Sequence, residues 1–276
     1  MTSSLAEFEV YALKYAERMG TRSGMFAGGD PHDGPMAMDY FIWALRDGDR
    51  TVVVDTGFSR EEGERRGRTF LRTPAEALAL IGVDPLEVAD VVITHLHYDH
   101  AGNLDAFPNA RFHIQDAEMG FATGRAMTHD AVRHSFRVDD VVAMVRHVYA
   151  ERVLFHSGDV EGEDAGLPRG LSLHHIPGHT PGQMALRVNT ARGRVVVASD
   201  SSHFYENFLD GRAFATHDSL SDLLDGHRRI RTLADSDEHV VPGHDPLVLS
   251  LYPPPSDDLV GAVASLHLPP RKRQDS

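Results

Sequence analysis

The sequence contains no cysteine, a single tryptophan, and fewer basic than acidic residues. Without cysteine there is no disulfide, no thiolate nucleophile and no thiolate metal ligand, so any metal site has to use histidine and carboxylate side chains. The 41 Asp and Glu against 27 Lys and Arg give a formal net charge of −14, which a phosphate backbone would repel. We therefore expect no nucleic-acid partner.

Long apolar runs are also absent. No segment approaches the roughly 20 apolar residues that cross a bilayer, and residues 1–5 lack a basic region followed by an apolar stretch. We therefore expect a cytoplasmic protein without a membrane partner. With 276 residues, of which 41% are hydrophobic, the chain can bury a substantial core.

Histidine is abundant, with 18 residues, and it gathers after one apolar segment. Residues 91–93 predict a short buried strand, and Thr94-His95-Leu96-His97-Tyr98-Asp99-His100 follows it. Side chains two positions apart on a strand leave on the same side, so His95 and His97 can bind one ion, whereas Asp99 and His100 need not join it. Such nitrogen and oxygen ligands suit zinc better than calcium or magnesium. The alternative is a surface cluster that is merely rich in histidine.

The same arrangement recurs along the chain, because a His or Asp follows an apolar strand at several places. These are Asp55 after 51–54, His95–His100 after 91–93, His179 after 171–176, Asp200 after 194–199 and His244 after 238–241. The pattern predicts that these side chains lie along one edge of a sheet system, where a pocket can form. With helices predicted over 74–81, 116–123, 138–149 and 220–233, strands in both halves favour one domain over 1–268, with two sheets covered by helices.

Three segments between and beyond these elements carry predictions of their own. Residues 19–36 are rich in glycine and proline, which predicts a loop, either a lid over a substrate or a flexible connection. Met25, Phe26 and Phe204 are candidates to line a substrate pocket, although such residues more often belong to the core. The charge-rich segment 61–68 is expected to form a solvated face, and residues 269–276 a disordered tail.

Four motifs together resemble the metallo-β-lactamase superfamily. They are H-x-H-x-D-H at 95–100, P-G-H-T-P-G at 177–182, an Asp after an apolar strand at 200, and P-G-H at 242–244. The resemblance covers about residues 51–245 and implies an α+β fold, an αββα sandwich of two mixed β-sheets flanked by helices. It also implies a dinuclear site, with His95, His97 and His179 on one zinc, Asp99, His100 and His244 on the second, and Asp200 bridging both.

The implied site has a clear chemistry. Two divalent ions roughly 3.5–4 Å apart need an anionic bridge, and a bridging hydroxide that forms near neutral pH can attack a carbonyl that a metal polarises. Two Zn²⁺ are expected, although a shell of nitrogen and oxygen also accepts manganese, iron or cobalt. Asp55 and Thr94 are candidates to orient a ligand imidazole. His97 favours hydrolysis, because a redox di-iron site would depart from histidine there.

Within the superfamily the sequence most resembles the N-acyl homoserine lactonases, on residues 97–103 and on 198–200 leading into 206–208. This implies a monomer or homodimer that opens a small-molecule lactone, with Asp99 and Asp200 in the catalytic centre. In the lactonases a tyrosine commonly lies three residues after the bridging Asp; here that position is His203, with Tyr205 two residues further. His203 can donate the same hydrogen bond or act as a general acid, and Tyr205 is the other candidate.

Two alternatives stay open at this point. The same fold can hydrolyse another small cyclic or activated carbonyl compound, such as a thioester, a lactam or another cyclic ester. A non-catalytic metal-binding scaffold is the third reading, but all seven ligand positions are intact, and a decayed site is expected to have lost some of them.

Overall fold

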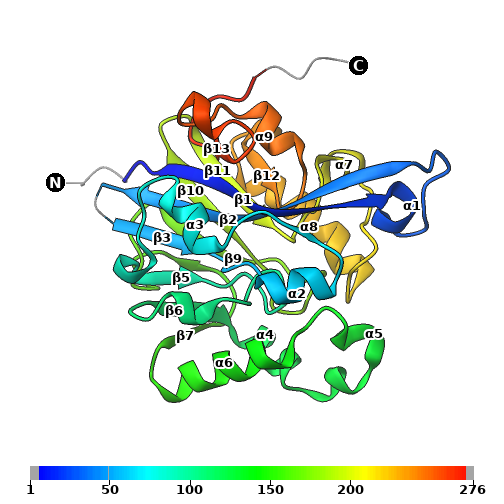
Figure 1. Cartoon of the computed structure of the whole chain (residues 1–276), viewed down its shortest axis with the longest axis horizontal. Helices are drawn as coiled ribbons and strands as arrows, with labels where there is room; N and C mark the ends of the chain where they lie inside the picture. The colour runs from blue at the N-terminus through cyan, green and yellow to red at the C-terminus, as the bar shows by residue number, and fades with distance from the viewer. Residues whose placement is uncertain (1–5, 49, 272–276) are drawn as a thin grey trace.

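Two mixed β-sheets packed face to face form the centre of the computed structural model, which describes residues 6–48 and 50–271 (Figure 1). The first sheet has the order β13-β1-β2-β3-β5-β6-β7, with β4 paired to β1. Its strands are β1 (Glu9–Thr21), β2 (Pro35–Asp47), β3 (Arg50–Val54), β4 (Thr69–Phe70), β5 (Asp90–Val92), β6 (Arg111–Gln115), β7 (Val153–His156) and β13 (Val263–Ser265). Strands β3, β5, β6 and β7 are parallel to one another, and the other pairs are antiparallel.

The second sheet has the order β12-β11-β10-β9-β8 and a single parallel pair, β11 with β12. Its strands are β8 (Val160–Glu161), β9 (Leu171–His175), β10 (Met184–Thr190), β11 (Gly193–Ser199) and β12 (Val240–Pro242). Because β13 returns from the end of the chain to pair with β1, both ends of the described chain join the same sandwich.

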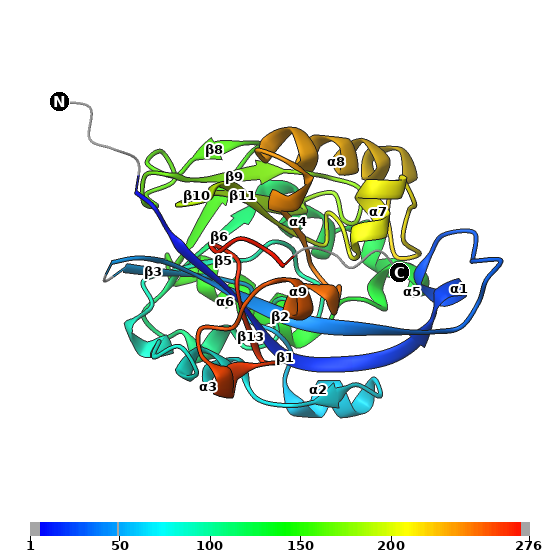
Figure 2. The same ribbon diagram turned by 90° about the horizontal axis from the view of Figure 1, so that it is seen from above.

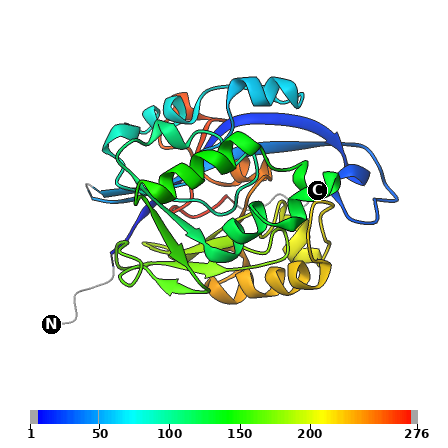
Figure 3. The same ribbon diagram turned by 90° about the horizontal axis from the view of Figure 1, so that it is seen from below.

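Helices cover the outer faces of both sheets, which completes the expected αββα order. Figures 2 and 3 show α8 on one outer side and α2 on the other, with the sheets between them. The α-helices are α1 (Arg22–Met25), α2 (Arg60–Arg65), α3 (Pro74–Ala79), α4 (Asp116–Ala122), α5 (Asp130–Arg133), α6 (Val138–Tyr149), α7 (Tyr205–Asp210), α8 (Leu220–Leu233) and α9 (Leu247–Leu251). Short 3₁₀ turns are η1 (Pro85–Glu87), η2 (Leu104–Ala106), η3 (Arg125–Thr128), η4 (Asp237–His239) and η5 (Asp257–Leu259).

Alternation along β2 shows how the sequence builds the layers. Phe41, Trp43 and Leu45 pack into the core shared with the second sheet, whereas Tyr40 and Ile42 pack with residues of α3 and α6. Side chains on a strand alternate between its two faces, so a strand that is apolar on both faces lies between a sheet and a helical layer. The helices predicted over 138–149 and 220–233 are confirmed with the same bounds as α6 and α8.

The loop predicted over 19–36 is wrong at both ends. Strand β1 continues to Thr21, β2 begins at Pro35, and these two residues are paired across a long hairpin whose tip carries α1. Backbone pairing along the hairpin outweighs the glycine content, and Pro35 occupies the first position of its strand, where a missing N–H is tolerated. The connection without strand structure is therefore confined to the tip.

The solvated face predicted over 61–68 is only partly correct. Glu62 is buried and accepts hydrogen bonds from Arg65 and Arg66, and only 7% of the Arg66 side chain is exposed. Buried charges are tolerated when they are paired in this way. Charge content alone does not show which residues of the segment turn inward.

The predicted tail lies mostly beyond the described chain, since residues 272–276 are outside it. Its first residues are packed, because the Arg271 N–H donates to the Leu251 carbonyl at 2.7 Å. Among the described residues, no helix has the length and apolar character needed to cross a membrane.

Candidate metal centre

The strand ends of both sheets meet at one cluster of imidazoles and carboxylates. Strand β5 of the first sheet leads into His95–His100, while β9, β11 and β12 of the second sheet lead to His179, Asp200 and His244. The seven predicted ligands are all buried: His95, His97, Asp99, His100, His179, Asp200 and His244. Within each of several groups of three, such as His95, His97 and His179, the ligand atoms lie within 4.8 Å of one another. The structure thus brings together every residue that the sequence predicted as a metal ligand.

Three imidazoles converge in the first group. The Nε2 atom of His179 lies 2.9 Å from Nδ1 of His97 and 3.2 Å from Nε2 of His95. The Nδ1 atom of His179 lies 2.7 Å from the Thr216 carbonyl, which can only accept, so Nδ1 carries the proton and Nε2 presents a lone pair. Nitrogen lone pairs held this close call for a cation between them.

The second group shares Asp200 with the first. The Nε2 atom of His244 lies 3.0 Å from Asp200 Oδ1 and 3.8 Å from Asp99 Oδ2, and Nε2 of His100 lies 3.4 Å and 3.7 Å from the same two carboxylates. Asp200 Oδ2 lies 3.2 Å from His179 Nε2, in the first group. In the described chain, His100 Nε2 and Asp200 Oδ1 are buried without a hydrogen-bonding partner. Such atoms fit a second cation, for which Asp200 is placed as a shared ligand.

The second nitrogen of each imidazole in this group is fixed by an acceptor behind it. The Nδ1–H of His244 donates to the Asp39 carbonyl, and that of His100 to the Asp55 carboxylate, both at 2.8 Å. Asp55 also accepts from the N–H of Thr94 at 2.8 Å and from its hydroxyl. These contacts set the tautomer and orientation of the ligands, in the way that the sequence suggested for Asp55 and Thr94.

Two non-glycine residues adopt left-handed backbone conformations at strand ends in the site. Asp55 has φ 62° and Ser199 has φ 45°, and their side chains meet, with Ser199 Oγ 3.4 Å from Asp55 Oδ2. Such conformations are unfavourable for residues with a Cβ and persist where the surroundings determine them. The turn at Asp55 presents the carboxylate of Asp55 itself. The turn at Ser199 presents the carboxylate of the next residue, Asp200.

Burial keeps the first group of imidazoles neutral. It lowers the pKa of His95 and His97 well below the ordinary value, and that of His179 to about 4. Neutral imidazole is the form that binds metal ions. The first group is therefore ready to coordinate at neutral pH without releasing a proton.

In the second group, the imidazoles and carboxylates shift one another's pKa values. Although burial disfavours its charged form, the carboxylates of Asp200, Asp55 and Asp99 hold the pKa of His100 well above the ordinary value. Burial also favours a neutral Asp200, yet the imidazoles of His244, His100 and His203 hold the pKa of that carboxyl well below its usual range. A cation that binds here takes the place of the proton on the imidazole.

Glu118 of α4 is a buried carboxylate behind the first group that the sequence did not single out. Its Oε1 accepts from the N–H of Leu96 at 2.8 Å, and its Oε2 accepts from the Thr180 hydroxyl at 2.6 Å and the Gly182 N–H at 3.2 Å. Leu96 lies between two ligands and Thr180 follows a third. Glu118 thus joins the two segments that supply the first group of imidazoles, a role that is visible only once the segments meet.

A cavity of about 240 Å³ opens onto the cluster. Its lining joins the hairpin, the segment after α2 and the loops that carry the ligands. The residues are Arg18, Gly24, Met25, Met38, Tyr40, Arg66, Arg68, His97, Tyr98, Asp99, His134, Ser135, His179, Asp200, His203, Ala215, Thr216 and His244. Of the predicted pocket residues, Met25 lies in this wall. Phe26 and Phe204 differ from the prediction, because they pack against each other in the core behind it.

Comparison with known proteins identifies the family. The family described as the metallo-beta-lactamase superfamily matches residues 37–251. The chain belongs to this superfamily. An N-acyl homoserine lactonase of a Bacillus species is 30% identical over 229 residues, which are 75% of this chain and 82% of that protein.

Solved structures agree on the fold of this superfamily member. A quorum-quenching N-acyl homoserine lactone lactonase is 22% identical with a TM-score of 0.71, over 89% of this chain and 94% of that one. A dizinc quorum-quenching lactonase, solved with the product N-hexanoyl-L-homoserine, is 16% identical with a TM-score of 0.66, over 88% and 90%. At these identities the likeness shows the αββα fold.

His203, which the sequence resemblance aligns with a tyrosine of the lactonases, faces the metal cluster. Its Nε2 lies 2.9 Å from Asp200 Oδ2, and its ring stacks on Phe214 with centroids 3.6 Å apart. Burial lowers the pKa of His203 to about 4, against the opposing charge of Asp200. The imidazole is therefore neutral near pH 7, which favours hydrogen-bond donation over the shuttling of a proton.

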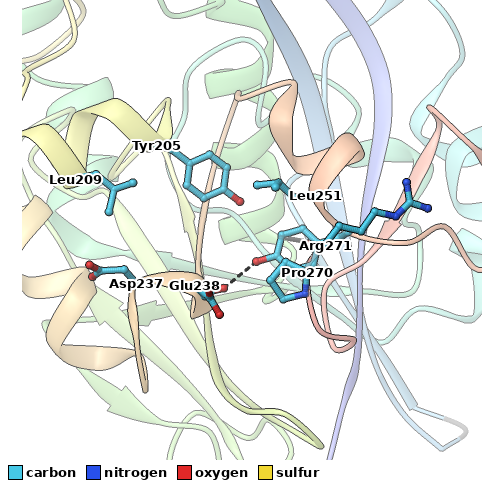
Figure 4. A pocket seen from close by; sticks show the side chains of 8 residues that line it. Tyr205, Leu209, Asp237, Glu238, Leu251, Pro270 and Arg271 are labelled. Atoms are coloured by element: carbon cyan, nitrogen blue, oxygen red, sulfur yellow. Dashed lines mark hydrogen bonds between the residues drawn. The ribbon is translucent and has the colours of Figure 1, made fainter. Parts of the chain in front are cut away.

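Tyr205, the other candidate for that role, lies on the far side of α7. Its ring lines a separate pocket with Leu251, Pro270 and Arg271, as Figure 4 shows. Its backbone N–H donates to Asp245, and its ring packs on Phe208. Of the two candidates, Tyr205 therefore lies outside the wall of the cavity at the metal cluster, and His203 lies in it.

Proposed function

We propose that this chain is a dinuclear zinc hydrolase that opens the ring of a lactone. The observation that carries the proposal is the pair of ligand sets that share Asp200, in which His100 Nε2 and Asp200 Oδ1 are buried without a hydrogen bond among the described residues. The Bacillus relative bears the name of a lactonase, and the dizinc lactonase has the same fold. Both support the substrate class and the metal.

The donor set supports zinc in both positions. His95, His97 and His179 would hold one ion, Asp99, His100 and His244 the other, and Asp200 both. Imidazole nitrogen and carboxylate oxygen are ligands that Zn²⁺ accepts in tetrahedral or five-coordinate sites with a position left for water or substrate. Two bound divalent ions lower the pKa of water and polarise an ester carbonyl.

Other groups of this chain orient the ligand imidazoles and stabilise the leaving oxygen. Asp55 and the Asp39 carbonyl keep the second set of imidazoles in their binding orientation. The ring of His203, fixed on Phe214, presents a neutral donor beside Asp200. As the ester bond breaks, the leaving oxygen gains negative charge, and we expect the Nε2–H of His203 to shift from Asp200 Oδ2 to that oxygen and stabilise its charge.

One experiment tests metal and reaction together. Purified protein is analysed for bound metal and then screened for acid release on lactones, thioesters and β-lactams, with Asp200→Asn as the control variant. We expect two zinc ions per chain and turnover of lactones. Turnover confined to thioesters or β-lactams would refute the lactone assignment, and full turnover by Asp200→Asn with a single ion would refute the dinuclear site.

A further inference from the structure

The cavity over the metal cluster carries more positive charge than a neutral lactone needs. Five arginines line it or the adjoining pocket, namely Arg18, Arg65, Arg66, Arg68 and Arg133. Three of them have acidic neighbours: Arg65 and Arg66 share the carboxylate of Glu62, and Arg133 pairs with Asp130. Among the described residues, Arg18 and Arg68 form no ion pair, and both lie in the wall of the metal cavity itself.

The contacts of these two side chains leave their charge available to a ligand. Arg18 donates to the sulfur atoms of Met38 and Met25 at 3.2 and 3.3 Å, and a thioether is a weak acceptor. Arg68 donates to the Tyr98 hydroxyl at 3.1 Å and the Arg66 carbonyl at 2.9 Å. Within the described chain, neither Nη1 of Arg18 nor Nη2 of Arg68 has a hydrogen-bond or ion-pair partner.

Both positive charges act on the same part of the cavity. Arg68 donates to the Tyr98 hydroxyl, which lies 3.4 Å from the Tyr40 hydroxyl, and Arg18 donates to the sulfur of Met38, two residues before Tyr40 on β2. Tyr40 lies in the cavity wall and its ring packs against the ligand His244. The two guanidinium groups thus approach the metal cluster from two elements far apart in sequence, β1 and the segment after α2.

The metal cluster does not neutralise these charges. Asp55, Asp99 and Asp200 supply three negative charges and a bridging hydroxide would supply a fourth, so two divalent ions would leave no negative charge to balance the arginines. Two arginines held beside such a centre, in a chain of net charge −14, attract anions to one location and leave the rest of the surface repulsive to them.

We propose that the substrate is a compact lactone that carries a carboxylate, and that Arg18 and Arg68 bind this group while the ring carbonyl faces the metal cluster. The proposal rests on the proposed hydrolase function and narrows its substrate class. The cavity of about 240 Å³ lies below the roughly 300–1,000 Å³ of pockets for drug-sized ligands, which suits a small charged ring. Guanidinium groups match the geometry and charge of a carboxylate.

The test compares two substrates that differ in one group, 5-oxotetrahydrofuran-2-carboxylate and its carboxamide. We expect the wild-type enzyme to prefer the carboxylate by at least about 10-fold in kcat/KM. Arg18→Gln and Arg68→Gln should each lower kcat/KM for the carboxylate by about 10- to 100-fold, the range for a hydrogen bond to a charged group. The carboxamide should change by less than about 3-fold, and Arg68→Lys should recover part of the loss.

Two controls separate recognition from structure. Arg65→Gln removes an arginine that is 62% exposed and paired with Glu62, and it should leave the preference unchanged. Metal content and the unfolding temperature of each variant show whether the fold and cluster persist. Because attraction between charges is screened by salt, the preference for the carboxylate should also decrease as ionic strength rises.

The outcomes also separate this proposal from the function on which it rests. Equal rates on both substrates, or equal losses on both in the arginine variants, overturn the carboxylate proposal and leave the lactonase proposal intact. If neither lactone is hydrolysed, the lactonase proposal fails. Calorimetry with tetrahydrofuran-2-carboxylate and metal-loaded protein then decides the binding question: at least 10-fold weaker binding to the Arg18→Gln and Arg68→Gln variants supports carboxylate recognition, and unchanged binding refutes it.

Discussion

Replacing Glu118 should loosen the segments that supply the first group of imidazoles. The carboxylate is fully buried and satisfies three donors, on Leu96, Thr180 and Gly182. Each buried donor left without a partner costs about 1–3 kcal/mol, so with three donors Glu118→Ala should lower the free energy of unfolding by about 3–9 kcal/mol. Glu118→Gln retains one oxygen acceptor and should lose about 1–3 kcal/mol.

Metal affinity should also fall, more in Glu118→Ala than in Glu118→Gln, because residues that support metal ligands typically contribute 10- to 100-fold in affinity. Chemical denaturation of metal-free protein measures the stability, and competition with a chelator measures the affinity. Asp116→Asn, an exposed carboxylate of the same helix, is the matched control and should change neither. If Glu118→Ala unfolds and binds metal like this control, the role assigned to Glu118 is refuted.

The same residue predicts a pH dependence of stability. Burial raises the pKa of Glu118 from 4.5 to about 7, although its three donors oppose the rise. Between these values the folded protein binds more protons than the unfolded chain, so the contribution of Glu118 to stability falls as pH rises through this window. The difference amounts to at most about 3 kcal/mol. Because Glu118→Gln cannot titrate, its stability should lack this fall relative to the wild type; parallel pH profiles would contradict the argument.

Three further predictions concern the cluster and the far end of the first sheet. His179→Ala and Asp200→Asn should each lose most of the hydrolytic activity together with bound metal, measured by elemental analysis, and retained activity at wild-type metal content would count against the ligand assignment. His203→Ala should lower kcat without changing metal content, and His203→Tyr should restore part of it if the role is hydrogen-bond donation; an unchanged kcat in His203→Ala would exclude this residue. Asp90 is buried beside Arg50, Arg111 and His113, which outweigh burial and hold the pKa of its carboxyl below the ordinary value. Its stabilisation is therefore present above about pH 4 and lost as pH falls further, so Asp90→Asn should cost about 1–3 kcal/mol at pH 7, and the difference from wild type in acid denaturation should shrink below pH 4.

The cluster of candidate metal ligands could be predicted because its signal is local. Each one follows an apolar strand, and a strand end fixes where the next side chain lies, so the motif at 95–100 and the residues at 179, 200 and 244 could be read from short stretches of sequence. The fold follows from the same pattern, since strands with apolar residues on both faces require layers on both sides, as β2 shows.

The remaining parts of the site depend on contacts between distant segments. Nothing in the sequence around Glu118 shows that Leu96 and Thr180 will meet its carboxylate. Tyr205 and His203 are two residues apart, yet the start of α7 sends them to opposite sides. Arg68 lies in a charged run that reads as solvated, and only the packing of the segment after α2 against Tyr98 brings it to the cavity.

Because the ligands lie on both sheets, a bound ion is also a cross-link between the two halves of the sandwich. His95 and His244 are about 150 residues apart in the chain, and joining such distant positions in the folded state limits how far the sheets can separate. In a protein without cysteine, metal bound by these residues would take the place that a disulfide between two sheets has in secreted domains. Loss of metal should then open the sandwich along the seam between the sheets first, where amide hydrogen exchange can follow it.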